Sequence, residues 1–235
     1  MSLPARTAVV SRVTNETKIQ VSLSLDGGIL PPYEPSSHFP AATPEEAEAA
    51  KKGIVPPKDA AHATQFTATQ QITAHTGIGF LDHMLHALAK HSGWSLALTT
   101  ITPRKTSSLP SAQPLPKRSA PANPLTRFGR GDAPLDEALS WAVIDLSSRP
   151  YAVIDLGFRR EKIGDLSTEM ITHGLESFAQ AAGVTLHVGC SYGSNDHHRA
   201  ESAFKALAVA VRTACSRRVA GEVGAGDVVS TKGVL

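Results

Sequence analysis

The 235-residue chain has few of the features that mark secreted, membrane-bound or nucleic-acid-binding proteins. Only Cys190 and Cys215 are present, so no disulfide framework is expected, and both are predicted to be buried thiols. No apolar run approaches the ~20 residues that cross a bilayer, and the N-terminal MSLPARTAVV lacks the apolar core of a secretory signal. A net charge of +2 is too small to indicate nucleic acid or an anionic membrane as partner. The sequence therefore predicts a soluble, cytoplasmic protein.

Proline is concentrated in two stretches, which hold 13 of its 16 occurrences. The first, Pro31 to Pro57, is predicted to be an exposed insertion, and the proline-rich insertion as a whole is placed at residues 28–65. The second, Ile101 to Thr126, has six prolines and lacks aspartate, glutamate, histidine and aromatic residues altogether. At that density the fixed φ and the missing N–H exclude a regular helix or a central strand. Both stretches are predicted to be irregular.

The remaining segments carry regular hydrophobic patterns, in a chain that is 41% apolar and 19% charged, an ordinary globular composition. Residues 10–27 alternate polar and apolar side chains and end in Asp-Gly, which is typical of a hairpin strand. Apolar residues at helical spacing predict three helices, and short β-rich runs predict further strands. The predicted helices span 79–90, 167–182 and 197–216, and the predicted strands span 94–100, 137–146, 151–156 and 184–190.

Two of the predicted helices match each other when the sequence is shifted by 90 residues. The shift pairs His83 with His173 and Gly93 with Gly183. Each helix then carries a histidine near its start, ends at a glycine suited to a left-handed C-cap, and leads directly into a strand. Duplication explains this agreement; chance similarity of two amphipathic helices is the alternative.

The third predicted helix opens with Asp-His-His-Arg-Ala-Glu. His197 and Glu201 are four residues apart and project from one helical face, whereas His198 points about 100° away and reaches a different centre. Imidazole and carboxylate together are ligands that transition metals prefer; the alternative is that the histidines only cap a surface helix. Duplication predicts a matching motif near residues 106–112, but these read TSSLPSA and contain no ligand.

Several motifs, in one order and spacing, resemble the imidazoleglycerol-phosphate dehydratase family: TGIGFLDHML, RFG, APLDEAL, DLSSRPY, DHHRAESAFKALA and STKGVL. The proline-rich insertion before the first motif is similar to the fungal branch. The resemblance implies an α+β fold of two related sheet-plus-helix halves, a ribosomal S5 domain 2-like duplication, of which the first half is incomplete here. Residues 1–100 then form the first half, 101–126 the irregular segment, and 127–235 the second half.

The resemblance also implies a function and a set of site residues. The family dehydrates imidazole glycerol phosphate in histidine biosynthesis, uses two manganese ions per site, and assembles as a 24-subunit homo-oligomer with sites between subunits. Matched motif by motif, the implied metal ligands are His83, His173, His197, His198 and Glu201. The implied catalytic carboxylates are Glu16 and Glu201. The implied contacts to the small phosphorylated imidazole substrate are Glu16, Arg127, Arg149, Lys205, Ser230 and Lys232. Simpler roles exist for some of these: Arg149 could be a surface turn residue, and Lys232 part of a mobile tail.

The sequence departs from the family at residues 101–126. Members have an Asp-Asp-His-His-Thr-x-Glu-Asp helix there, so two histidines and one glutamate of the ligand set are missing. One metal keeps His173, His197 and Glu201, and the other keeps only His83 and His198. The sequence therefore predicts impaired dehydration, and a first-half sheet whose uncovered face promotes aggregation.

Three interpretations remain at this point. The first is a dehydratase whose coding sequence carries a splice or reading-frame error across residues 101–126. The second is a non-catalytic metal-binding or assembly subunit of the same family. The third is a sugar or metabolite kinase on a similar small fold, which the lack of a glycine-rich phosphate loop disfavours.

Overall fold

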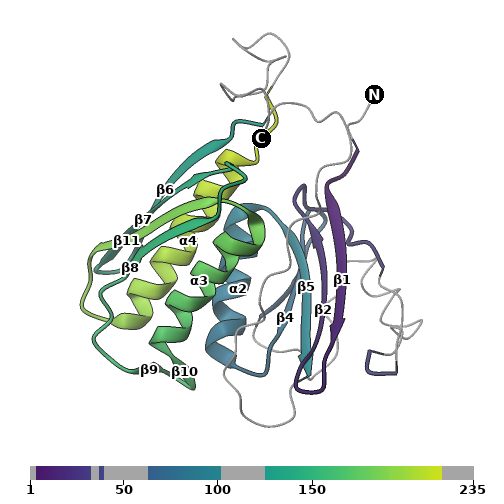
Figure 1. Cartoon of the computed structure of the whole chain (residues 1–235), viewed down its shortest axis with the longest axis horizontal. Helices are drawn as coiled ribbons and strands as arrows, with labels where there is room; N and C mark the ends of the chain where they lie inside the picture. The colour runs from purple at the N-terminus through teal and green to yellow at the C-terminus, as the bar shows by residue number, and fades with distance from the viewer. Residues whose placement is uncertain (1–3, 33–36, 40–62, 102–124, 219–235) are drawn as a thin grey trace. The chain divides into compact units, whose positions relative to one another are not determined.

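The computed structural model describes residues 4–32, 37–39, 63–101 and 125–218 (Figure 1). The chain divides into two compact units, residues 1–107 with 164–166, and residues 108–163 with 167–235. Nearly all of the irregular segment predicted at 101–126 lies outside the described residues. Ser230 and Lys232 lie outside them too.

The first unit is a five-stranded sheet with the order β1-β2-β5-β4-β3. β4 and β5 are parallel, and α2 connects them. The alternating segment at 10–27, predicted as one strand, proves to hold most of an antiparallel pair, β1 and β2. Their turn is closed by Thr14, whose Oγ1 donates to the Thr17 carbonyl and accepts from the Thr17 N–H, each at 3.0 Å. The elements are β1 (Thr7–Val13), β2 (Lys18–Ser24), β3 (Thr64–Phe66), β4 (Gln71–His75), α2 (Gly79–Ser92) and β5 (Ser95–Ile101).

One face of this sheet is polar, yet its side chains are buried. Ser22 donates to the Pro31 carbonyl, Ser24 to the Gly27 carbonyl and Ser95 to the Gly28 carbonyl, each at 2.7 Å. The chain that follows β2 therefore lies across this face and satisfies its hydroxyl groups. The described residues of the predicted exposed stretch, Pro31 to Pro57, are mixed, since Pro32, Ser37 and His38 are exposed whereas Phe39 is buried. After this stretch Ala63 is buried and β3 begins at Thr64.

The second unit is a four-stranded sheet with the order β6-β7-β11-β8. β8 and β11 are parallel and α3 connects them, while α4 follows β11 and packs mainly on β6 and β7. Strand β6 had no counterpart in the sequence prediction. The elements are β6 (Phe128–Leu135), β7 (Ala138–Asp145), β8 (Tyr151–Asp155), the short β9 (Lys162–Ile163) and β10 (Leu166–Ser167), α3 (Thr168–Ala182), β11 (Thr185–Tyr192) and α4 (Asp196–Ala214).

The two units repeat one topology. β1-β2-β5-β4 and β6-β7-β11-β8 have the same order, and in each unit the parallel pair is joined by one helix. α2 and α3 both end at a left-handed glycine, Gly93 with φ 79° and Gly183 with φ 67°. The predicted α+β fold of two related sheet-plus-helix halves is confirmed. By this correspondence, a first-unit equivalent of α4 would follow β5, in residues 102–124, which lie outside the described part of the chain.

Helix α4 approaches its sheet very closely. A Cβ added at Gly129 would lie 1.9 Å from the Ala210 carbonyl oxygen, and one at Gly131 would lie 2.2 Å from that of Ala206. The apolar residues at helical spacing along this helix are all buried: Ala200, Phe204, Leu207, Val211 and Ala214. Glycine on the strand and alanine on the helix thus bring the two backbones together.

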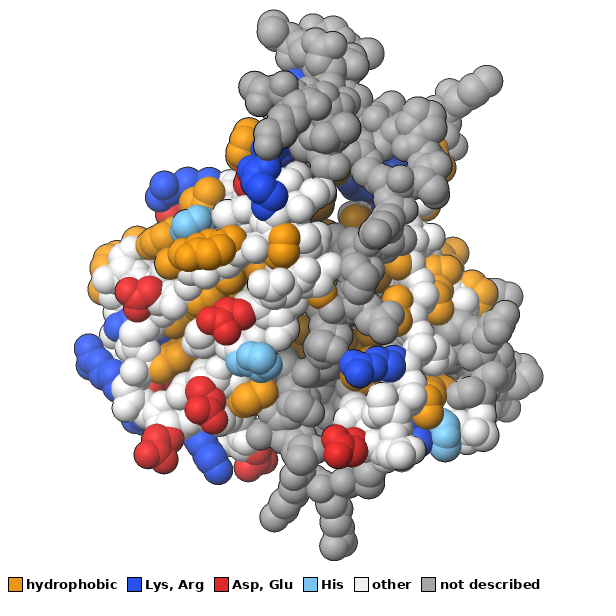
Figure 2. Space-filling model, in the orientation of Figure 1, with side chains coloured by type: hydrophobic (Ala, Val, Ile, Leu, Met, Phe, Trp, Pro, Cys, Tyr) orange, Lys and Arg blue, Asp and Glu red, His pale blue; other side chains and the backbone are white. Residues whose placement is uncertain are grey.

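The second unit also carries large apolar side chains on its surface. Phe128 is 52% exposed, Tyr151 63% and Val153 45%. Figure 2 shows hydrophobic side chains gathered over the strands of this unit. In the described part of the chain, we find no helix with the length and apolarity to span a membrane. Of the two cysteines, Cys215 is buried as predicted, but Cys190 is partly exposed.

Candidate metal and substrate site

The first turn of α4 is fixed from outside the helix. The Asn195 side chain is its N-cap and accepts a hydrogen bond from the His197 N–H at 2.9 Å. Asp196 is 2% exposed, and its Oδ2 accepts from the backbone N–H groups of Arg159 at 3.0 Å and Arg160 at 2.7 Å. These bonds connect the start of the helix to the loop after β8. The backbone positions of the candidate residues in this turn are therefore fixed.

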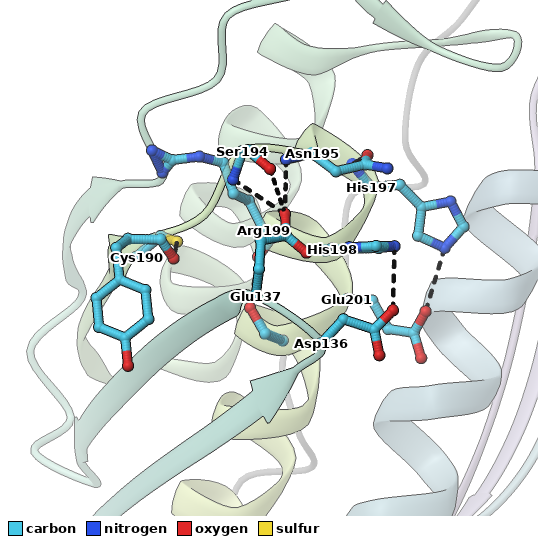
Figure 3. Close-up of polar contacts among 11 residues, drawn as sticks. Asp136, Glu137, Cys190, Ser194, Asn195, His197, His198, Arg199 and Glu201 are labelled. Carbon is cyan, nitrogen blue, oxygen red and sulfur yellow. Dashed lines mark hydrogen bonds and ion pairs between the residues drawn. The ribbon is translucent and has the colours of Figure 1, made fainter.

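Three candidate residues follow one face of this helix at intervals of four. The His197 Nε2 lies 3.2 Å from Oε2 of Glu201, and the Lys205 Nζ lies 2.8 Å from Oε1 of the same carboxylate. The Glu201 side chain is 12% exposed, whereas that of His197 is 42% exposed. The carboxylate therefore has a partner on each oxygen, and Figure 3 shows its contact with the partly exposed His197 ring.

His198 diverges from His197 and meets a different carboxylate. The two rings are 5.9 Å apart between centroids and inclined by 80°. The His198 Nδ1 lies 2.6 Å from Oε2 of Glu137, while its Nε2 lies 3.8 Å from Asp136. The hydrogen bond that His198 donates to Glu137 raises the pKa of His198, and the same bond lowers the pKa of Glu137. Sequence reasoning missed Glu137, although it lies within the quoted APLDEAL motif.

Two candidate phosphate contacts share an aspartate. The Arg127 Nε donates to Oδ1 of Asp145 at 2.7 Å, and the Arg149 guanidinium lies 3.8 Å from Oδ2 of the same residue. The bond to Asp145 raises the pKa of Arg127. Arg127 has φ 74°, and its backbone N–H donates to the Ala214 carbonyl at the end of α4. Asp145, which sequence reasoning also missed, thus holds Arg127 firmly and Arg149 loosely.

His173 lies on α3 in the second unit. Its side chain is exposed on α3 and lines an open depression of about 630 Å³. None of the α4 candidates lines that depression, so within this unit the structure does not group His173 with His197 and Glu201. Their grouping remains a prediction. The described lining consists of Tyr151, Ala152, His173, Glu176, Ser177, Gln180 and Ala181.

Two candidates belong to the first unit. His83 is half-buried on α2, next to the buried Asp82. Asp82 accepts hydrogen bonds from the Thr76 N–H and the Thr76 hydroxyl, both at 2.6 Å, which anchors the loop before α2. Glu16 is exposed in the turn between β1 and β2. The roles implied for His83 and Glu16 stay predictions.

The donor pair on α4 fits a divalent metal ion. Two ligand atoms about 2.1 Å from one ion, at angles of 90–110°, are about 3.0–3.4 Å apart. The 3.2 Å between the His197 nitrogen and the Glu201 oxygen falls in that range. One imidazole nitrogen and one carboxylate oxygen are also a suitable donor set for transition metals. The second unit therefore contains a candidate metal-binding His/Glu group, and the chain is a duplicated α+β protein with such a group at the head of a buried helix.

Comparison with known proteins identifies the family. The profile of imidazoleglycerol-phosphate dehydratase matches residues 112–211. The dehydratase of Candida albicans is 52% identical over 239 residues, covering 98% of this chain and 99% of the relative. That of Saccharomyces cerevisiae is 52% identical over 237 residues, covering 97% of each. The chain belongs to the imidazoleglycerol-phosphate dehydratase family, whose named members are hydro-lyases of histidine biosynthesis.

Solved structures support the fold. The dehydratase of Pyrococcus furiosus aligns with a TM-score of 0.63 at 24% identity, covering 96% of this chain and all of that one. The enzyme of Staphylococcus aureus aligns with a TM-score of 0.59 at 22% identity, covering 90% and 99%. At this level of identity the likeness bears on the fold, and it agrees with the duplicated sheet-and-helix architecture.

Proposed function

We propose that this chain binds imidazole glycerol phosphate and converts it to imidazole acetol phosphate, with activity reduced by the segment at residues 101–126. The main support is the His197–Glu201 turn on α4, in a chain 52% identical to fungal dehydratases over almost its whole length. In the reaction the C–O bond on the carbon next to the ring and a C–H bond on the neighbouring carbon break. A C=C bond forms, water leaves, and the resulting enol becomes a ketone.

We propose His173, His197 and Glu201 as ligands of one metal ion and His83 and His198 as ligands of another, with manganese as the metal. When bound, such ions would act as Lewis acids that stabilise the deprotonated imidazole ring of the substrate, and would so favour loss of the hydroxyl group on the carbon next to the ring. The chain's own contribution is to hold the two histidines of α4 in divergent directions. Since the rings are inclined by 80°, they can serve separate ions.

The substrate phosphate is assigned to Arg127, Arg149, Lys205, Ser230 and Lys232. A planar guanidinium can bind two phosphate oxygens at once, and serine and lysine add single contacts. Arg149 is the more available arginine, because its side chain is 65% exposed, whereas that of Arg127 is 12% exposed. Arg127 is held in place by Asp145 before any ligand arrives.

The proton carrier is assigned to Glu16 rather than Glu201. Both Glu201 oxygens already have partners, His197 at 3.2 Å and Lys205 at 2.8 Å. A carboxylate that is paired with a lysine and bound to a metal is a weak base. Glu201 is therefore better suited to hold a metal, and Glu16, which is exposed in its turn, is free to move a proton between carbon and water.

Impairment follows from the sequence of the segment after β5, which supplies no histidine or carboxylate. The second ion then retains only His83 and His198, so its affinity falls. The retained α4 group also supports an alternative role, as a non-catalytic subunit that assembles with an intact copy. We further propose that the protein acts in the cytoplasm as a homo-oligomer of the 24-subunit type.

The test is an assay of purified protein with manganese, beside a chimera that carries the aligned stretch of the Candida albicans relative in place of residues 102–124. We expect turnover of the natural chain to be more than ~100-fold below that of the chimera, since even loss of groups supporting metal ligands costs 10–100-fold. Equal turnover refutes the impairment. A folded chimera without activity refutes the proposal that this chain catalyses the dehydration. Co-purification of the natural chain with a tagged intact copy, without activity of its own, favours the subunit role.

A further inference from the structure

The carboxylate of Glu137 makes an unusual number of contacts for a residue in a hairpin turn. It follows Asp136, which has φ 45°, between β6 and β7. Its Oε1 accepts hydrogen bonds from the Ser194 N–H and hydroxyl, both at 3.0 Å, and from the Asn195 N–H at 2.8 Å. Its Oε2 faces the His198 Nδ1 at 2.6 Å. One side chain thus joins the β6–β7 turn to the start of α4, 57 to 61 residues away (Figure 3).

These contacts fix both the position and the chemistry of the imidazole. A carboxylate can only accept, so the His198 Nδ1 must carry the proton and donate it to Glu137. In the neutral ring, Nε2 then keeps its lone pair. The bonds to Ser194 and Asn195 hold the residues that precede α4, and Asn195 is the N-cap of that helix. Ring orientation, tautomer and helix start therefore depend on one group.

We propose that Glu137 is a positioning residue that presents the Nε2 lone pair of His198 to a divalent metal ion. The proposal rests on the proposed function, which makes His198 a ligand. Asp136, 3.8 Å from Nε2, is the competing acceptor. Without Glu137, the ring can place its proton on Nε2 toward Asp136. Nε2 then has no lone pair available for the metal ion.

The substitution Glu137→Gln separates the two functions of the carboxylate. If the amide oxygen keeps the bonds to Ser194 and Asn195, the amide NH₂ faces the His198 Nδ1, which must then accept. The proton moves to Nε2, so the variant keeps its shape but reverses the tautomer. Glu161→Gln is the matched control, since Glu161 is exposed and its side chain makes no hydrogen bond or ion pair with any residue that the structure describes.

Two measurements on the full chain test the proposal. In the metal-free protein, ¹⁵N chemical shifts of His198 at alkaline pH should report the Nδ1–H tautomer in the parent and in E161Q, and the Nε2–H tautomer in E137Q. In a titration with Mn²⁺ alone, E137Q should bind the ion assigned to His83 and His198 about 10- to 100-fold less tightly than the parent does. E161Q should bind it as tightly as the parent. Circular dichroism checks that all variants are folded.

The variant His198→Gln distinguishes failure of this proposal from failure of the proposed function. If H198Q weakens Mn²⁺ binding and E137Q does not, the positioning role is wrong and the ligand assignment stands. If neither variant changes Mn²⁺ binding, His198 is no ligand and both fail. Adding E137Q to H198Q should cause no further loss, because Glu137 acts through the ring; an additive loss overturns the proposal.

Discussion

Replacing Gly129 by alanine should destabilise the protein strongly for a change of one methyl group, because α4 lies directly on β6. The added Cβ would sit 1.9 Å from the Ala210 carbonyl oxygen and 2.8 Å from the Ala214 nitrogen. Real Cβ atoms essentially never approach other atoms within 3.0 Å. Both neighbours are backbone atoms that cannot rotate away, so α4 must move from the sheet by more than 1 Å.

The expected cost follows from this displacement. Overpacking a close-packed core costs about 1–3 kcal/mol, and a clash with helix backbone belongs at the upper end, about 3 kcal/mol. For a chain of this length, each kcal/mol lowers the melting temperature by about 2–4 °C, so G129A should melt about 6–12 °C lower. Because His197 and Glu201 belong to the displaced helix, Mn²⁺ binding should weaken as well.

Urea unfolding, followed by circular dichroism, measures the change in the free energy of unfolding. Gly79→Ala is the matched control: nothing lies within 4 Å of an added Cβ there, and the residue begins α2. Alanine in place of helical glycine should leave stability unchanged or raise it by up to about 1 kcal/mol. The reasoning is refuted if G129A costs less than about 0.5 kcal/mol while G79A behaves as expected.

Three further predictions concern the first unit and the segment after it. Gln70→Ala should destabilise the protein by about 1–3 kcal/mol in urea unfolding, since the buried Gln70 Nε2 donates to the Ala89 carbonyl at 2.8 Å and to the Trp94 carbonyl at 2.9 Å, and the substitution leaves the buried Trp94 carbonyl without this donor. A loss below about 0.5 kcal/mol would contradict this. Burial, helped by His83 and Lys90, lowers the pKa of His86 below its ordinary 6.5, so the unfolded chain binds the proton first and stability should fall as pH drops below 6.5. His86→Gln should flatten that pH dependence in unfolding curves between pH 5 and 7, and an unchanged slope would exclude His86 as its source. Sequencing the transcript across residues 95–130 should reveal codons for a His-His-x-x-Glu helix if the segment reflects a splice or frame error, and an uninterrupted reading of residues 101–126 would rule that explanation out.

The helices α2 and α3 were predictable because their signals are local. Apolar spacing of 3.6 residues marks the buried face of a helix, and a glycine marks its end. Strand β6 could not be predicted in the same way. Gly129, Gly131 and Pro134 weaken any strand pattern, and the two glycines are needed because Ala206 and Ala210 of α4, far away in the sequence, pack against them. The turn between β1 and β2 was missed because it uses threonine hydroxyls instead of glycine or proline.

In the candidate site too, local contacts could be predicted from the sequence, whereas contacts between distant residues could not. The i,i+4 spacing of His197 and Glu201 predicts that their side chains meet, and they do so at 3.2 Å. Glu137 and Asp145 were not predicted, because their partners depend on which strand turns come to lie beside α4 and β6. His198 is 61 residues from Glu137, and Arg127 is 18 residues from Asp145. Sequence spacing identifies what one helical face carries, but the fold decides which groups support it.

Helix α4 serves the core and the candidate site at once. The alanine face that contacts Gly129 and Gly131 holds the second sheet together, and the first turn of the same helix carries His197, His198 and Glu201. Since the first unit repeats the topology, a helix after β5 would combine the same two roles, and the sequence there supplies neither ligands nor helical spacing. Stability and metal binding should therefore rise together when residues 102–124 are exchanged for the Candida albicans stretch. A chimera that gains metal affinity without becoming more stable would show that the two roles are separable in this half.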